Sequence, residues 1–213
     1  EFMDRHLIKM GNRDVTGGDF RWVLDSILVN RHYPENVITL ERKEWGNFYG
    51  YLINVKESGQ IIESGDAAWT EFSKRIDRAL EIHEEIHEIE KTEIGHINSE
   101  MERLRLKQRG YELRDELSAE NLNELNTKRE ILDAEYADLQ QRLIDLYTEI
   151  NRDTATVETA DNHRIEVKLS HIVRAFQPNK MTIGDKIGHY VEKLIEFVTD
   201  DPREANTEGG IFP

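Results

Sequence analysis

Residues 122–150 contain nine positions, eight of them apolar or aromatic, that follow one another at alternating intervals of three and four residues. This series constrains the fold more than any other feature of the sequence. Such spacing over four heptads is the a/d seam of a coiled coil, in which these positions meet a partner helix. One member of the seam, Arg129, is not apolar. The members are Leu122, Leu125, Arg129, Leu132, Tyr136, Leu139, Leu143, Leu146 and Ile150.

The surrounding region, residues 66–151, has the composition of long surface helices. It contains no proline and only two glycines, and it is rich in Glu, Arg, Lys and Leu. We expect two antiparallel helices, over about 66–116 and 119–151, that fold back at "DELSAE" with Ser118 as the N-cap of the second. At ~1.5 Å per residue the first helix would reach about 75 Å, so the hairpin must project from a compact body.

A second apolar series, in the first of these helices, contains one irregular step. The step from Ile86 through Glu90 to Ile94 has four-residue spacing twice in succession, which is typical of a stutter. Two registers of the helical hairpin are therefore compatible with the sequence. The members of this series are Ile82, Ile86, Ile89, Ile94, Ile97, Met101 and Leu104.

β-Strand patterns precede and follow the helical region. Runs rich in Val, Ile, Tyr and Phe predict hairpins around Gly46-Asn47 and Asp161-Asn162, and Ser58-Gly59 marks a further turn. "DFRWVLDSILV", near the N-terminus, suits a strand or a short helix equally. A helical stripe then precedes Pro202 and comprises Ile183, Ile187, Tyr190, Val191, Leu194, Ile195 and Val198.

These patterns predict an α+β fold. A small β-rich body is built from both flanks of the chain, residues 1–65 and 152–213. The antiparallel coiled-coil hairpin, 66–151, is inserted between them, and a C-terminal helix follows.

The chain composition excludes several classes of function. The formal net charge is −15 and there are no cysteines among the 213 residues. The charge disfavours an electrostatic grip on nucleic acid, and the missing thiols exclude disulfides, thiol catalysis and cysteine zinc sites. No stretch approaches the ~18 apolar residues that indicate a membrane span.

The string HEEIH at 83–87 matches the H-E-x-x-H spacing of zinc hydrolases. There, His83 and His87 would bind the metal and Glu84 would act on its water. The neighbouring isoleucines form a coiled-coil stripe among charged residues, so we expect these histidines to flank the seam in water. We predict no catalytic residues, no metal ligands and no cofactor.

Two other groups have both a structural and a functional explanation, and two further motifs are incomplete. Arg103, Arg105, Lys107 and Arg109 could bind an acidic partner, but we expect them to pair with Glu130, Asp133 and Glu135 on the returning helix. The aromatic residues of the first hairpin could line a groove, but we expect a core position for Trp45, Phe48, Tyr49 and Tyr51. Asp200-Asp201 lacks the rest of a calcium loop, and "VTGGDF" lacks the lysine of a phosphate loop.

The tail "KLIEFVTDDPREANTEGGIFP" resembles a segment of the permease subunit of phosphate-specific ABC importers. In that family an "NTEGG" stretch, here Asn206 to Gly210, lies on the external side, before the permease core. "DFRWV", "ERKEWGNFYGYL", "EIGHINSEMERLRLK" and "VRAFQPN" resemble a long insertion between the first and second transmembrane helices of some members.

This resemblance implies a non-catalytic periplasmic domain of a bacterial inner-membrane protein. The parent protein would assemble with a companion permease subunit, ATPase subunits and a phosphate-binding protein, and the coiled coil leaves open a homodimer. Glu1-Phe2, the residues an EcoRI site encodes, and the abrupt end at "TEGGIFP" lead us to expect a segment of a longer protein. The alternatives are a soluble coiled-coil adaptor and a zinc hydrolase that uses HEEIH.

Overall fold

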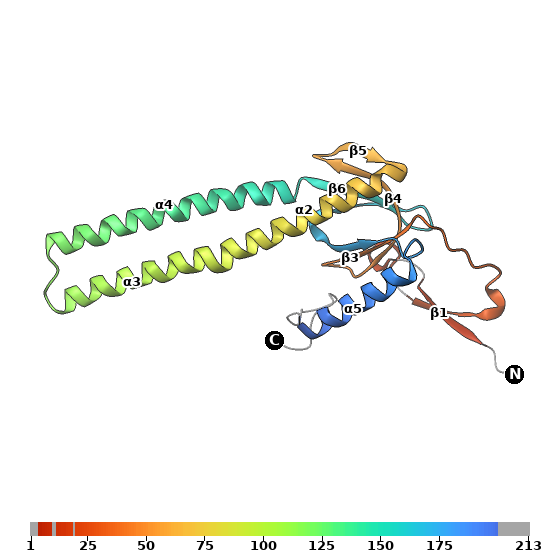
Figure 1. Cartoon of the computed structure of the whole chain (residues 1–213), viewed down its shortest axis with the longest axis horizontal. Helices are drawn as coiled ribbons and strands as arrows, with labels where there is room; N and C mark the ends of the chain where they lie inside the picture. The colour runs from red at the N-terminus through yellow and green to blue at the C-terminus, as the bar shows by residue number, and fades with distance from the viewer. Residues whose placement is uncertain (1–3, 10–11, 19, 200–213) are drawn as a thin grey trace. The chain divides into compact units, whose positions relative to one another are not determined.

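The structure, a computed structural model, describes residues 4–9, 12–18 and 20–199 (Figure 1). The chain divides into two units. We call Glu1–Arg78 together with Arg152–Pro213 the body, and Ala79–Asn151 the arm. The sheet of the body is antiparallel and the arm is helical, so the predicted α+β class is confirmed.

The main sheet of the body combines strands from both flanks of the chain. It contains β3 (Val37–Arg42), β4 (Phe48–Glu57) and β5 (Gln60–Ser64) from before the arm, and β6 (Asp153–Glu158), β7 (Arg164–Lys168) and β8 (Ile172–Phe176) from after it. The strand order is β7-β6-β4-β3-β8, with β5 paired to β4. The pairs β4–β6 and β3–β8 join the two flanks, as the sequence predicts.

The predicted hairpin turns occur where residues adopt positive φ. Asn162 has φ +63° between β6 and β7, and Ser58 and Gly59 have φ +48° and +80° between β4 and β5. Trp45 and Gly46 have φ +66° and +67° in the connection between β3 and β4. Positive φ at two successive residues gives the twist that tight hairpins need.

The N-terminal segment forms a separate two-stranded sheet of β1 (Arg5–Lys9) and β2 (Phe20–Leu24), with the short helix α1 (Arg13–Thr16) between them. The ambiguous string "DFRWVLDSILV" contributes β2 and a following 3₁₀ turn, Asp25–Ile27. Asn12 attaches this segment to the main sheet. Its amide Nδ2 donates to the Tyr49 carbonyl at 3.1 Å, and its Oδ1 accepts from the Tyr49 amide at 2.8 Å.

Strand β3 is buried on both sides of the sheet. Ile38 and Leu40 are fully buried, and Thr39 and Glu41 are 4% and 8% exposed on the opposite side of the strand. In β4, a Cβ on Gly50 would lie 2.2 Å from the Glu158 carbonyl oxygen, so this position admits only glycine. Further core residues are Phe48, Val55, Ala68, Phe72, Ile76, Ala155, Val157, Val167, Leu169 and Ile172.

One helical run leads into the arm and a second forms its return. The first comprises α2 (Ala68–Glu88), which begins after the 3₁₀ turn Gly65–Ala67, a π-helical turn (Ile89–Glu93) and α3 (Ile94–Leu113). The second is α4 (Ala119–Ile150), and the Ser118 side chain accepts from the Asn121 amide at 3.1 Å, which confirms the predicted N-cap. The first run ends three residues before the predicted 116.

The predicted seam is the least exposed face of the arm. Ile82, Ile86, Ile89, Ile97, Leu104, Leu125, Leu146 and Ile150 are buried, whereas Leu122 at the start of the seam is 36% exposed. The irregular step is accommodated by the π-helical turn, across which Ile89 and Ile94 are five positions apart. A π turn adds one residue to a helix, so the seam stays on one face without the unwinding that a stutter would cause.

Candidate functional site

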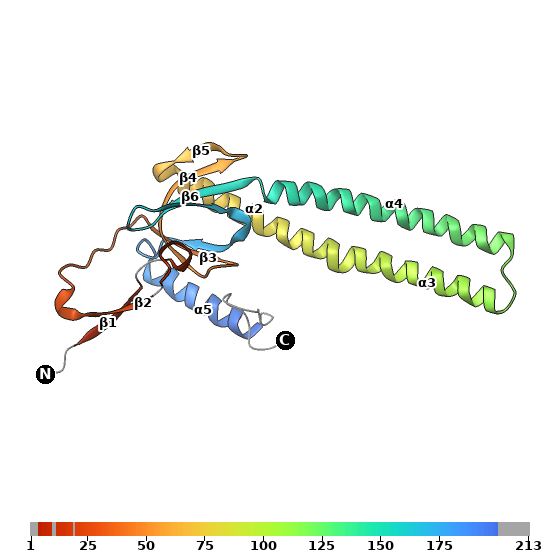
Figure 2. The same ribbon diagram turned by 180° about the vertical axis from the view of Figure 1, so that it is seen from behind.

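A pocket of about 480 Å³ lies between the main sheet and α5 (Ile183–Thr199), the C-terminal helix of the body. Figure 2 shows α5 from the reverse side. Strands β3 and β8 supply one wall and α5 supplies the other. The lining residues are Val37, Thr39, Glu41, Asn47, Tyr49, Phe176, Pro178, His189, Tyr190 and Lys193.

The polar side of α5 faces this pocket and the sheet. Lys193 Nζ lies 2.7 Å from Glu41 Oε2, and Arg174 Nη1 lies 3.4 Å from Glu196 Oε2. The His189 ring is 4.7 Å from the Phe176 ring, centroid to centroid. Charged pairs and one ring contact therefore hold the helix to the sheet.

The predicted aromatic core of the first hairpin is wrong for two of its four residues. Phe48 is fully buried and Tyr51 is half-buried, but Trp45 is 64% and Tyr49 is 40% exposed. Trp45 lies in a turn rather than a strand, and Tyr49 points to the side of β4 that borders the pocket. Lys9 Nζ lies 4.4 Å from the Tyr49 ring centroid, within the range of a cation–π contact.

HEEIH lies within α2, between the buried residues Ile82 and Ile89 of the arm seam. His87 is exposed and His83 is half-buried. Among residues 4–9, 12–18 and 20–199, no three His, Asp or Glu side chains are grouped so that they could hold a metal ion.

The basic residues of α3 do not have the predicted partners. Arg103 pairs with Glu100 at 2.5 Å, Arg105 with Glu102 at 2.8 Å and Arg109 with Glu112 at 2.9 Å, all within their own helix. Only Lys107, among the four, is shown with an ion pair to α4, and its partner is Glu124 at 3.4 Å. Residues three apart on one helix are already neighbours, so these long side chains need not cross to the other helix.

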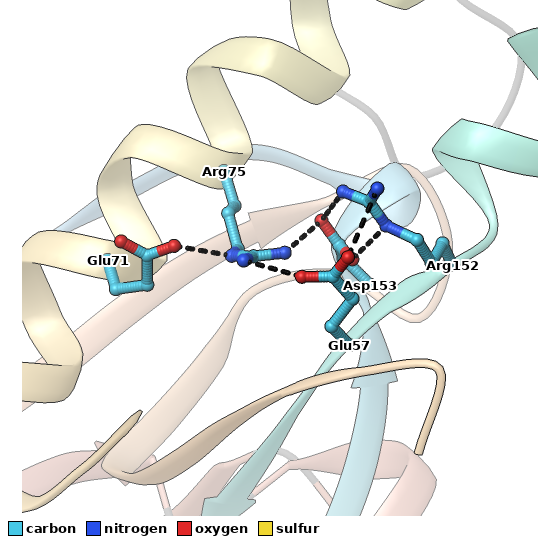
Figure 3. Close-up of polar contacts among 5 residues, drawn as sticks. All are labelled: Glu57, Glu71, Arg75, Arg152 and Asp153. Atoms are coloured by element: carbon cyan, nitrogen blue, oxygen red, sulfur yellow. Dashed lines mark hydrogen bonds and ion pairs between the residues drawn. The ribbon is translucent and has the colours of Figure 1, made fainter. Parts of the chain in front are cut away.

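The most connected charged group of the body surrounds Arg75 (Figure 3). The guanidinium contacts Glu71 at 2.7 Å, Glu57 at 2.9 Å and Asp153 at 2.7 Å, and Arg152 contacts Asp153 at 2.8 Å. Burial alone would lower the pKa of Arg75, but hydrogen bonds to the three carboxylates raise this pKa above its usual value. Each of the three guanidinium nitrogens of Arg75 donates to a different carboxylate, so this group has the character of a structural clamp.

The arm carries a hollow and several exposed apolar side chains. The hollow, about 460 Å³, lies beside the π-helical turn and is lined by Thr92, Glu93, His96, Ile97, Glu135, Asp138 and Leu139. Near the helix–helix connection, Leu106 is 59% and Leu113 is 73% exposed. Leu117 and Leu122 flank Ser118 at the positions of a hydrophobic staple, which gives them a local structural role.

Comparison with protein-family models, with curated proteins and with solved structures finds no match to this chain. Asp200-Asp201, Pro202 and the "NTEGG" stretch lie outside the described residues. In the described part of the chain, no helix is both long and apolar enough to cross a membrane.

Proposed function

We propose that this chain is a non-catalytic periplasmic domain of a phosphate importer permease and supports phosphate uptake through contacts with other proteins. The tail string and the four upstream strings support the parentage. The observation that supports a contact role is the pair of exposed leucines, Leu106 and Leu113, near the connection of the arm helices. Residues seven apart lie on the same face of a helix, and exposed apolar side chains that share a face are typical of protein interaction sites.

The proposed partner of the arm is the phosphate-binding protein, while the companion permease and the ATPase subunits assemble with the parent protein. Phosphate itself is not the expected ligand of the domain. With a formal net charge of −15, the chain repels an anion unless a local basic site outweighs the repulsion. The four basic side chains of α3 already pair with carboxylates, which leaves them poorly suited to such a site.

The parentage is tested by reading the native gene on both sides of this segment. We expect apolar runs of about 20 residues on each side, the length that crosses a bilayer. Stop codons or polar sequence at both places would contradict the parentage and would favour the coiled-coil adaptor.

The contact role is tested by a pull-down of the phosphate-binding protein with the full permease. Leu106→Asp is expected to reduce capture at least tenfold, because a carboxylate would be buried in the interface. Ile144→Asp is the matched control, since Ile144 is 58% exposed and Leu106 is 59% exposed. Equal capture by both variants would show that the arm leucines do not make the contact. Calorimetry of the domain with phosphate should show no heat, and micromolar binding would contradict the proposed role.

A further inference from the structure

Helix α5 is oriented opposite to the usual surface helix, which turns its apolar stripe to the core. Its polar residues His189, Lys193 and Glu196 face the sheet, where Glu41 and other residues hold them. Its large apolar side chains are left in solvent. They are Ile183, Ile187, Tyr190, Val191, Leu194, Ile195, Phe197 and Val198, between 47% and 80% exposed.

The exposed apolar side chains of α5 form a wide face without a charge. At about 100° per residue they cover an arc of about 160° around the helix axis. The only other residue of the helix within this arc is Gly184, so no charged residue interrupts it. A continuous face of this width must be covered by something that is itself apolar.

We propose that this face of α5 binds the interfacial region of a phospholipid bilayer, with the helix axis parallel to the membrane plane. A helix with one wide apolar face and one strongly polar face is suited to this position, where the apolar side sinks among the upper acyl chains. The inference goes beyond the proposed function and does not depend on it.

The width of the face favours a bilayer over a second copy of the chain. A two-stranded pairing would use the seam Ile183, Ile187, Tyr190, Leu194 and Phe197, whose steps are four and three residues. Such seams are normally flanked by charged residues that select the partner. Here one flank carries Val191, Ile195 and Val198, which a single partner helix would leave in water and a bilayer would cover.

The β1–β2 sheet, also in the body, provides an independent apolar surface. Leu7 pairs directly with Trp22, and Phe20 lies two residues from Trp22, so the three side chains share one side of the ribbon. They are 52%, 64% and 61% exposed. Figures 1 and 2 both draw this sheet and α5 below the strands of the main sheet. Tryptophan is enriched where proteins meet the membrane–water interface.

The charges of α5 predict which lipids are needed. The helix carries Lys186 and Lys193 against Asp185, Glu192 and Glu196. It therefore has no excess of positive charge to attract anionic lipids. Binding should come from apolar burial, so it should occur on neutral lipid and persist at high salt.

The test is flotation of the purified chain with phosphatidylcholine vesicles at low and high salt. We expect the chain to float in both, and Leu194→Asp to reduce the floating fraction at least tenfold. Ile61→Asp is the matched control on β5, because Ile61 is 61% exposed and Leu194 is 63% exposed. Circular dichroism shows whether both variants keep their helix content, and Ile187→Asp repeats the test at another position if the first variant fails to fold.

Two outcomes would overturn the proposal. One is a chain that stays with the unbound fraction, including the case in which it forms a dimer that Leu194→Asp dissociates. The other is a Leu194→Asp variant that floats as well as the original chain. Pure vesicles contain no importer subunit, so failure here is distinguishable from failure of the pull-down.

Discussion

Helices α4 and α5 both carry apolar side chains at intervals of three and four residues, but these side chains meet different surroundings. In α4 the stripe faces the other helix of the arm, where Leu125, Leu146 and Ile150 are 7% exposed or less. In α5 the stripe is exposed and the polar side faces protein. The same periodicity therefore leads to opposite orientations in the arm and in the body.

The difference between the two helices follows from the partners that the polar side chains of each helix find. Around the arm seam, acidic and basic residues satisfy one another along the surface, as in the pair Lys128–Glu124 at 2.7 Å, and water solvates the rest. In α5, Lys193 and Glu196 find Glu41 and Arg174 on the sheet. These fixed partners on the sheet set the orientation of α5 in the body.

The largest expected effect is a difference in stability between two substitutions, one in the buried seam of the arm and one in the exposed apolar stripe of α5. Ile82 is 1% exposed and belongs to the arm core with Ile86, Leu146 and Ile150. Ile82→Ala should lower the free energy of unfolding by about 2–4 kcal/mol, because it removes buried methyl groups and leaves a cavity. Leu194→Ala, at 63% exposure, should change it by less than about 0.5 kcal/mol.

Urea denaturation followed by circular dichroism measures both variants. If Leu194→Ala proved as destabilising as Ile82→Ala, the outward orientation of the α5 stripe would be wrong. If Ile82→Ala had no effect, the arm would lack the packed seam described above.

A smaller effect is expected from the charged group around Arg75 in the body. Arg75→Met keeps the aliphatic stem but leaves Glu57, Glu71 and Asp153 without their shared partner. The free energy of unfolding should fall by about 2–3 kcal/mol, because removing the Arg75 charge from a partly buried network leaves three carboxylates with Arg152 as the one remaining cation of the group. Arg105→Met in the arm is the control, since Arg105 pairs only with Glu102 at an exposed surface, and no measurable change is expected.

The smallest expected effect is the pH dependence of the stability that the charged group around Arg75 provides. Burial alone would raise the pKa of Asp153, but hydrogen bonds and charge attraction from Arg152 and Arg75 lower it below its usual value. A lowered folded-state pKa gives stability that is present above about pH 4, the usual value for aspartate, and lost as the pH falls through the folded-state pKa.

The difference in stability between the original chain and Arg75→Met should therefore shrink by on the order of 1 kcal/mol between pH 6 and pH 3. Denaturation curves at both pH values measure this change. A difference that stays constant would show that Arg75 does not favour the ionised form of Asp153.

The sequence predicts those parts of the fold that depend on local chemistry. The seam of the arm follows from its three- and four-residue steps, the start of α4 from Ser118, and the hairpin at Asp161-Asn162 from its turn residues. The body built from both flanks follows because the β patterns lie on either side of a helical excursion.

The remaining features depend on contacts between distant residues, which periodicity cannot predict. The orientation of α5 requires the Glu41–Lys193 pair, which joins residues far apart in the chain. Asn12 has no motif that predicts its two hydrogen bonds to Tyr49. The basic residues of α3 had acidic neighbours on both helices in the sequence, and the choice between them depends on side-chain geometry.

The pairing of Glu57 with Asp153 in the β4–β6 ladder has a consequence for how the chain can vary. Arg75 contacts both residues, so β4 and β6 are held to α2 close to the points where the arm begins and ends in the chain. A short turn in place of residues 79–151 would leave every strand of the main sheet with its neighbours. The length of the arm can therefore change by the insertion or removal of whole heptads in both of its helices. The body keeps its architecture in each case.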